Sequence, residues 1–529
     1  MKKAWRWAAN GLLIALLAAC GQSSSTDPAA QGAARELNTL DMKESDKLSW
    51  PMGGQDYRNT RSNTEQKKTN IHNVNQLALR WKIDTAGDVS ATPAVVDGAV
   101  YFPDWSGDMY KVDARSGGVL WKKRLPSDGG MQAIARTSPA VVENIVYIGD
   151  QHGYVEALST ESGSILWRTR PNPGPFPVIT QSPVVYNGVV YVGSASAEEG
   201  VAANSSYACC TFRGSFQALD AHTGAVLWQT FMTPQGYSGA GIWSSTPALD
   251  TASNTVYITT GNNYKIPPSV TACFTSAGSD PAAQHACVNP DNHVDSIMAL
   301  DMNTGRIKWA TSALVYDSWN VACIFGGINC PPGAGPDFDF GAGANLMTID
   351  LPGGKKMQVV GAGQKSGQYW MLDAATGAVL WNTQVGPGST LGGIEWGTAT
   401  DGKRIYVAIA NLNRLPYPGR PDLGNAGSFA ALDPETGAVL WQVKDPNPFM
   451  DLGAVSVSNG VVYAGSMSGH MYALDAESGK IGWTYLGAGS SNAGPAIDND
   501  GAVFWGNGYE RFGLGTPGHA FYAFSRGGK

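Results

Sequence analysis

The chain has 529 residues, of which 43% are hydrophobic and 15% charged, and its formal net charge is −7 at pH 7. An acidic balance of this kind argues against nucleic-acid binding, because phosphate backbones require a basic surface. The length exceeds that of one ordinary domain, so internal repeats decide the number of domains.

The N-terminus has the pattern of a bacterial export signal. Three basic residues precede an apolar stretch, residues 11–19, which is too short to span a membrane as a helix. The stretch ends in Leu-Ala-Ala-Cys, which resembles a lipobox and predicts lipidation of Cys20. We therefore expect a lipoprotein signal peptide at residues 1–19, a flexible tether at 20–45 and the folded domain at 46–529.

The same pattern predicts where the protein resides. No acidic residue directly follows Cys20, which by the usual sorting rule indicates anchoring to the outer membrane, with the domain in the periplasm or at the cell surface. The lipid would be the only contact with a membrane. Removal of residues 1–19 takes away three positive charges and no negative ones, so the net charge becomes about −10. Such a surface favours a neutral or cationic partner.

Six cysteines remain after Cys20, and an even count in an exported protein predicts disulfides. No Cys-x-x-Cys-His sequence is present, so we expect no covalently attached haem on this chain. The simplest pairing is local and gives Cys209–Cys210, Cys273–Cys287 and Cys323–Cys330.

One repeat recurs along the mature chain: a strand usually ending in Asp, a turn containing Ser/Thr-Gly, and a second strand carrying Trp. Asp475 can cap such a turn, and Gly479 supplies its left-handed residue. The large Trp ring can then pack between neighbouring units. The repeated Trp residues are Trp121, Trp167, Trp228, Trp309, Trp381, Trp441 and Trp483.

A further strand pair precedes each repeat, as where Asn459-Gly460 predicts a hairpin. Four strands per unit, repeated around a ring, form a propeller blade. Seven units are complete, and an eighth is divided between residues 77–81 and residues 521–525. We therefore predict an all-β, eight-bladed β-propeller that closes by pairing its N- and C-terminal strands, which leaves no free sheet edge.

Three insertions interrupt the middle blades, around residues 197–215, 262–295 and 313–345. Long loops on a rigid scaffold are where function usually resides. We therefore expect the functional site among these insertions.

The repeats, together with the N-terminal run from Trp50 to Arg61, resemble the quinoprotein alcohol dehydrogenases, which use pyrroloquinoline quinone (PQQ). The resemblance covers residues 49–526. The Cys-rich insertion leading into Asp337–Gly341 is most similar to the polyvinyl-alcohol dehydrogenases of that family. Outer-membrane assembly lipoproteins have similar repeats without a cofactor, so a non-catalytic scaffold is the alternative.

The resemblance implies a metal site. Glu198 and Asn262 match the positions of two metal ligands in the family, and Glu199 takes the role of Glu198 if the register is shifted by one. Asp337 matches the general base, with Asp339 as the base in the alternative register. An acid at position 339 resembles lanthanide-using relatives and some calcium enzymes, so calcium or a lanthanide is implied, with both aspartates as further ligands.

The resemblance also implies how the cofactor is held. Trp243 matches the tryptophan that forms the floor under PQQ, Lys365 matches a basic residue that bonds the quinone oxygens, and Arg136 pairs with a cofactor carboxylate. The Cys209–Cys210 ring would form the roof, or would only rigidify its loop. In this chain the pair follows Glu198, whereas methanol dehydrogenases place it before that glutamate.

The expected activity is oxidation of an alcohol, with a secondary alcohol or polyvinyl alcohol favoured. Electrons would pass to a separate carrier such as cytochrome c, since this chain encodes none. Besides the scaffold, a degenerate member that binds a sugar or polymer without chemistry stays open.

Overall fold

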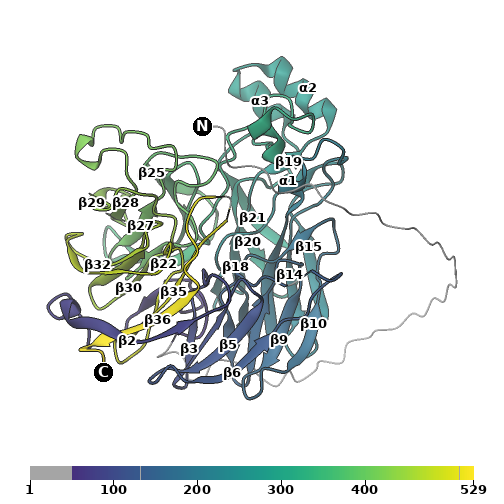
Figure 1. Ribbon diagram of the computed structural model, residues 1–529. Helices are drawn as coiled ribbons and strands as arrows, with labels where there is room; N and C mark the ends of the chain where they lie inside the picture. The colour runs from purple at the N-terminus through teal and green to yellow at the C-terminus, as the bar shows by residue number, and fades with distance from the viewer. Residues whose placement is uncertain (1–49, 132, 512) are drawn as a thin grey trace, which may run out of the picture. The chain divides into compact units, whose positions relative to one another are not determined.

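Antiparallel sheets follow one another along the chain in the computed structural model (Figure 1). The structure describes residues 50–131, 133–511 and 513–529, all within one unit that begins at Thr39. The predicted signal peptide, Cys20 and the tether lie outside these residues.

The first four sheets hold the strands that follow. They are β3 (Ala94–Val96), β4 (Ala99–Pro103), β5 (Asp108–Asp113), β6 (Val119–Arg124); β7 (Ala140–Val142), β8 (Ile145–Gly149), β9 (Val155–Ser159), β10 (Ile165–Thr169); β11 (Pro177–Val178), β12 (Val184–Tyr186), β13 (Val189–Ser196), β14 (Ser215–Asp220), β15 (Val226–Phe231); and β17 (Ala248–Asp250), β18 (Thr255–Thr259), β20 (Ser296–Asp301), β21 (Ile307–Ser312).

The next three sheets are built in the same way, and a short β1 joins the last of them. They are β22 (Asn345–Leu351), β23 (Lys355–Gly363), β24 (Gln368–Asp373), β25 (Val379–Gln384); β26 (Ala399–Thr400), β27 (Ile405–Ile409), β28 (Ser428–Leu432), β29 (Val439–Lys444); and β30 (Ser456–Ser458), β31 (Val461–Gly465), β32 (His470–Asp475), β33 (Ile481–Leu486), with β1 (Ser62–Asn63).

The eighth sheet joins the two ends of the described chain. It holds β34 (Ala496–Ile497), β35 (Val503–Asn507), β36 (Ala520–Arg526) and β2 (Leu77–Asp84). β2 pairs antiparallel with β36, so that Trp81 faces Ala523. The eight sheets are the blades of an eight-bladed β-propeller, which confirms the predicted fold and its closure by the terminal strands.

The repeated Trp and Gly residues join each blade to the next. The Nε1 of Trp81 donates to the carbonyl of Ala114 at 3.0 Å, and its ring lies on Gly117, which has φ +73°. The other repeats show the same contact, and Trp483 completes the circle by donating to Leu77 at 2.9 Å. Glycine is required at this position for two reasons. Its backbone is left-handed, and a Cβ there would meet the indole ring.

The segment from Trp50 to Asn63 connects blades across one end of the ring. Its carbonyl groups accept hydrogen bonds from the innermost strands of six blades. The donors are the backbone N–H groups of Val95, Val141, Leu249, Leu346, Thr400 and Val457. The segment therefore ties the inner edges of these blades together.

The three predicted insertions carry most of the helical structure, and Figure 1 shows α1, α2 and α3 at the same end of the unit. Asn329 in the third insertion donates to the carbonyls of Ala202 and Tyr207 in the first, at 3.0 and 2.9 Å. The helices are α1 (Glu198–Val201), α2 (Pro268–Ala277) and α3 (Pro281–Cys287), with 3-10 turns η2 (Val74–Gln76), η3 (Val321–Phe325) and η4 (Pro421–Leu423).

The three predicted disulfides are confirmed. One links Cys209 to Cys210, one connects α2 to α3, and one closes the loop around η3. A small sheet of β16 (Ser238–Gly239) and β19 (Asn263–Lys265) lies in the same region. None of the helices in the described ranges has the length and apolar character that crossing a membrane requires.

Candidate active site

A cavity of about 220 Å³ lies where loops from seven blades meet, which places it near the axis of the ring. Trp243 and Trp396 supply aromatic walls, and Leu452 adds an apolar surface. Charged side chains line the rest of it. They are Arg136, Glu199, Asp339, Lys365, Glu395 and Arg511.

Lys365 is the central cation of this cavity. It follows β23, and its side chain is only 7% exposed. Its Nζ donates to Asp337 at 2.9 Å and to Asp339 at 3.1 Å. Burial alone would lower the pKa of Lys365, but the surrounding carboxylates raise it well above its usual value, so the ammonium is charged.

The two predicted aspartates have different surroundings. Asp339 accepts three hydrogen bonds, from Trp243 Nε1 at 2.7 Å, from Lys365 and from the backbone N–H of Asn262 at 2.8 Å. Asp337 accepts one, on Oδ1 from Lys365, and its Oδ2 accepts none from the described residues. Burial, opposed by Lys365, raises the pKa of Asp337 well above its usual range. Of the two, Asp339 lines the cavity.

Trp243 presents a face to the cavity, as expected of a platform for a flat molecule. Its Nε1 is fixed by Asp339, and its ring meets that of Trp396 edge-on with centroids 5.4 Å apart. The Nζ of Lys365 lies 5.2 Å from its ring centroid. These contacts hold the indole in one orientation.

The adjacent glutamates Glu198 and Glu199 face different surroundings. Glu199 lines the cavity, and its Oε1 is buried without a hydrogen-bond partner among the described residues. Burial and then the charge of Asp339 raise the pKa of Glu199 to about 8, while Lys365 opposes the rise. Glu198 is absent from the described lining of the cavity.

Glu198 instead organises the loop that carries the cysteine pair. Its carboxylate accepts from the Tyr207 hydroxyl at 2.6 Å and from the backbone N–H groups of Thr211 and Phe212 at 2.8 and 2.7 Å. It is fully buried. These bonds satisfy both oxygens within the loop.

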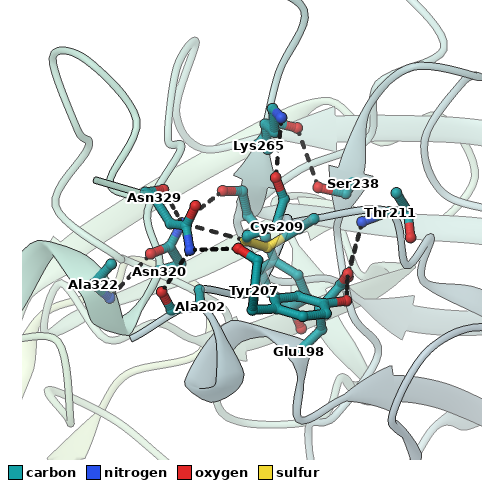
Figure 2. The surroundings of a disulfide bond; sticks show 12 residues. Glu198, Ala202, Tyr207, Cys209, Thr211, Ser238, Lys265, Asn320, Ala322 and Asn329 are labelled. Carbon is teal, nitrogen blue, oxygen red and sulfur yellow. Dashed lines mark hydrogen bonds between the residues drawn. A yellow bond between two sulfur atoms is a disulfide. The ribbon is translucent and has the colours of Figure 1, made fainter. Parts of the chain in front are cut away.

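Figure 2 shows this loop around the disulfide, with Tyr207 and Glu198 on one side and Asn320 on the other. Cys209 and Cys210 are each 7% exposed and cluster with Tyr264. The Cys209 carbonyl accepts from Lys265 Nζ at 3.0 Å. The pair is not among the described residues that line the cavity, whereas Tyr264 lines it.

Asn262 and a second pair of acids, Asp295 and Asp317, form the surroundings of the two aspartates. The Asn262 side chain donates to the Trp319 carbonyl at 2.9 Å. Asp317 accepts the backbone N–H groups of Asp337 and Phe338 at 3.1 and 2.7 Å, which fixes the loop that carries the predicted base. Asp295 is fully buried, and burial together with the charge of Asp317 raises its pKa well above its usual range.

Arg136 lies among three aromatic rings at another wall of the cavity. Its guanidinium is 5.2 Å from the ring centroids of Trp105 and Trp396 and 5.5 Å from that of Tyr509, and its Nη2 donates to the Tyr509 hydroxyl at 3.1 Å. The rings hold the planar cation toward the cavity, where it can meet an anionic group.

Glu395, Trp396 and Arg511 are among the lining residues that were not predicted from the sequence. Glu395 is buried, with Oε1 lacking a hydrogen-bond partner among the described residues, and burial raises its pKa to about 7. Trp396 lies outside the repeated Trp register, as Trp243 does, and this signal could have identified the Glu395-Trp396 pair. Nothing in the sequence singles out Arg511.

The residues present fit both a metal ion and an acidic planar cofactor. Glu199, Asp339 and Asn262 offer the oxygen ligands that hard cations prefer, and the unpartnered Glu199 Oε1 is the observation that calls for one. Among the described residues no preformed cluster of three metal-ligating acids, His or Cys is found, and Lys365 lies between the two aspartates. PQQ carries three carboxylates, and Arg136, Lys365 and Arg511 line the cavity.

Comparisons with known proteins show which family the chain resembles. A PQQ-repeat family model, described as outer membrane protein assembly factor BamB, matches residues 67–311 and 365–514. Polyvinylalcohol dehydrogenase of Sphingopyxis sp. (strain 113P3) is 30% identical, covering 87% of this chain and 74% of that protein. Polyvinylalcohol dehydrogenase of a Pseudomonas species is 28% identical, and the match spans 78% of this chain and 63% of that protein.

Solved structures show the same fold. Quinohemoprotein alcohol dehydrogenase ADHIIG of Pseudomonas putida HK5 aligns with a TM-score of 0.73 at 20% identity, covering 93% of this chain and 83% of that one. A europium-containing methanol dehydrogenase aligns with a TM-score of 0.71 at 18% identity, covering 91% and 99%. At these identities the likeness concerns the fold alone.

Eight blades with these repeats, around a cavity walled by tryptophans and charged groups, define a propeller of the quinoprotein class. The chain belongs to the PQQ-dependent alcohol dehydrogenase family, in which polyvinyl-alcohol dehydrogenases are among its relatives. The family predicted from the sequence is therefore confirmed, and with it the prediction of an enzyme rather than a scaffold.

Proposed function

We propose that this protein oxidises an alcohol with PQQ and a bound cation in the cavity beside Lys365, and passes the electrons to a separate carrier. The observation that carries the proposal is the Lys365 ammonium held between two buried aspartates under an exposed indole face. When bound, the quinone would accept a hydride from the alcohol carbon, with the cation polarising its reactive carbonyl.

Trp243 would support the quinone ring from one face, since its indole is fixed by Asp339 and Trp396. Arg136 and Lys365 would meet its anionic and carbonyl oxygens. The Cys209–Cys210 pair would support the cofactor indirectly, through Tyr264, which packs with the disulfide and lines the cavity. A disulfide that rigidifies the Tyr264 wall of the cavity would combine the two roles considered for the pair, which were to cover the cofactor and to rigidify its own loop.

Glu199, Asn262 and Asp339 would hold the cation. Glu199 has the free oxygen, whereas the oxygens of Glu198 are committed to its own loop, so the register shifted by one residue is the one we propose. Calcium or a lanthanide would suit these ligands, and the second acid at Asp339 supplies the extra negative charge that a trivalent ion requires.

Asp337 would take the hydroxyl proton of the alcohol, which requires that its free oxygen be reached from the cavity that Asp339 lines. A general base needs an oxygen with an available lone pair, and Oδ2 of Asp337 accepts no hydrogen bond from the described residues. Both oxygens of Asp339 are engaged by neighbouring donors, which suits a positioning and metal-binding role. Lys365 would hold the two carboxylates apart, and its charge opposes the rise in the pKa of Asp337 that burial causes.

The apolar part of the cavity favours an alcohol with a hydrocarbon substituent. Leu391, Leu452 and Leu514 line it beside Trp396. Such a surface favours secondary alcohols and segments of polyvinyl alcohol over methanol, in keeping with the names of the relatives. We propose export, lipidation at Cys20 and an outer-membrane location from the N-terminal sequence alone.

The test is reconstitution of the full chain with PQQ and either calcium or a lanthanide, followed by dye reduction with secondary alcohols and polyvinyl alcohol. Turnover should require both additions, and Asp337→Asn should lower kcat by roughly 100-fold or more. Quenching of tryptophan fluorescence gives PQQ binding independently of turnover. A protein that binds no PQQ with either cation would overturn the proposal, and loss of turnover in Asp339→Asn alone would move the base to Asp339.

A further inference from the structure

A second, smaller cavity adjoins the first, and Arg136, Thr180 and Trp396 line both. Its volume is about 40 Å³, room for roughly three water molecules or one small ion. Its walls come from residues just before the innermost strands of several blades, among them Ser138 before β7 and Ser182 before β12.

Arg61 reaches this cavity from the segment that ties the blades together. The side chain is 1% exposed. Its N–H groups donate to the carbonyls of Val455 and Gly53, both at 2.7 Å, and to the hydroxyls of Thr92 and Ser456 at 3.0 and 3.2 Å. All four acceptors are uncharged.

The positive charge of Arg61 therefore has no counter-ion in the described part of the chain. Burial lowers the pKa of Arg61 to about 9, with no opposite charge offsetting it, and the guanidinium is still protonated at neutral pH. A buried charge is normally paired, because removing it from water without a partner is unfavourable. An anion bound in the space beside Arg61 would therefore stabilise the folded protein.

The hydroxyl groups around the cavity are arranged as donors. Each of four lining serines already accepts an N–H group, and none of their O–H hydrogens has an acceptor among the described residues. These serines are Ser90, Ser138, Ser182 and Ser245, which accept from Trp105 Nε1, Thr92 N, Ser138 N and Gly343 N. A hydroxyl whose oxygen is occupied in this way is left to donate.

Other buried groups around the cavity are unpartnered. Thr180 Oγ1, Arg136 Nε and Asn492 Oδ1 are buried without a hydrogen-bond partner in the described structure, and the first two can donate. No carboxylate is among the described residues of the lining. The described lining of the cavity therefore offers two guanidinium groups and a set of hydroxyl groups that can donate, with the Asn492 amide oxygen as an unpartnered acceptor.

We propose that this inner cavity binds a small monovalent inorganic anion of the chloride type, beside Arg61. The volume admits one such ion, and the surrounding hydroxyl and guanidinium groups can donate to it. The anion would neutralise Arg61 beneath the wall formed by Trp396. The site is built from residues other than the proposed metal ligands and does not depend on the proposed oxidation.

Bromide is the probe that tests the site directly. Crystals of the protein loaded with PQQ and calcium are soaked in sodium bromide, and anomalous scattering is measured at the bromine absorption edge. A peak within about 3.5 Å of the Arg61 guanidinium and the serine hydroxyls is expected. Density that fits water only, or bromide found solely in the larger cavity at Arg136, would overturn the proposal.

Thermal unfolding gives a second test that does not need crystals. Replacing gluconate by chloride at constant ionic strength should raise the Tm of the wild type by about 2 °C and then saturate. Thr180→Val keeps the side-chain shape but removes a donor and should weaken the effect, and Arg61→Met should abolish it if that variant folds. Arg58→Met, altering a neighbouring arginine outside the cavity, should keep the full rise; an equal chloride response in Thr180→Val and wild type would refute the site.

Discussion

At the scale of single residues, the adjacent Glu198 and Glu199 show how one position changes a role. Both lie in the first turn of α1, and successive side chains on a helix point about 100° apart. One carboxylate therefore turns into the loop of Tyr207 and Thr211, while the other reaches the cavity. The sequence left both registers open, because the loop that follows α1 determines the direction in which each glutamate side chain points.

We predict that Glu199→Gln lowers metal affinity by at least ~10-fold, because the change removes the charge of a proposed ligand at nearly the same volume. Glu198→Gln should leave metal affinity almost unchanged and lower the Tm, since it weakens the bonds to two backbone N–H groups. Titration with a luminescent lanthanide and thermal unfolding separate the two outcomes. A loss of metal binding confined to Glu198→Gln would reverse our assignment.

Glu156 in β9 gives a prediction on pH. It is fully buried and accepts from Arg168 at 2.7 Å, yet burial and then the charge of Asp150 raise its pKa from 4.5 to about 7. Between these values the folded protein binds the proton that the unfolded chain releases. The contribution of Glu156 to stability is therefore present below pH 4.5 and is lost as the pH rises to about 7.

The variant Glu156→Gln cannot titrate and should escape this loss. Relative to wild type, its free energy of unfolding should increase by about 2–3 kcal/mol between pH 5 and pH 8, the order given by the shift in pKa. Urea unfolding of both proteins at the two pH values measures the difference. Parallel pH dependences would show that Arg168 keeps the carboxyl ionised throughout.

At the scale of the elements, each repeat forms a hairpin and also connects its own blade to the preceding one. The Asp of each copy, which is Ser159 in the second, closes the turn together with the Gly, and the Trp of the preceding blade lies on that glycine. Propensity and turn chemistry predicted the hairpins correctly because they act within a few residues. The stacking of indole on glycine was foreseen only as packing between blades, since its partner lies about 40 or more residues away.

Gly437 tests this joint. It has φ +73°, and a Cβ there would lie 2.5 Å from the ring of Trp381. We expect Gly437→Ala to destabilise the protein by about 2–4 kcal/mol, from the left-handed backbone and the displaced indole together. Chemical unfolding measures the change.

Gly460 provides the matched control, because it has φ +77° and no atoms within 4 Å of the added carbon. Gly460→Ala should show the backbone contribution alone, about 1–2 kcal/mol. Equal effects of the two substitutions would mean that the indole moves aside freely.

At the scale of the whole molecule, closure of the ring decides stability. β2 and β36 are at opposite ends of the described chain and pair over residues 77–84 and 520–526. Phe521 and Phe524 of β36 are fully buried. Without this strand, β2 and β35 would both present open edges, which favour aggregation.

A chain truncated after His519, which lacks β36, should therefore fail to accumulate as a soluble monomer. A chain truncated after Gly527 keeps the whole strand and should behave as the wild type does. Size-exclusion chromatography and thermal unfolding of the two compare them directly. A stable, monomeric protein without β36 would show that the other seven blades suffice.

The sequence by itself determined the blade count and the turns, because both follow from a local pattern that repeats. It also determined the three disulfides, because each joins cysteines that are close in the sequence. It also placed Trp243, Lys365, Asp337 and Asp339 in one group through the family resemblance. The cavity of the structure brings these residues together, although their roles there stay proposals.

Only the tertiary structure decided which groups face one another inside the ring. The position of Lys365 between two aspartates and the burial of Arg61 depend on residues that are distant in sequence, and Glu198 turns away from the cavity because the folded loop that follows binds its carboxylate. Their energies are set by burial and by the charges that surround them, which no local pattern encodes. The repeat in the sequence therefore predicts the propeller fold. The contacts between side chains in the central cavity are determined only when the eight blades close into a ring.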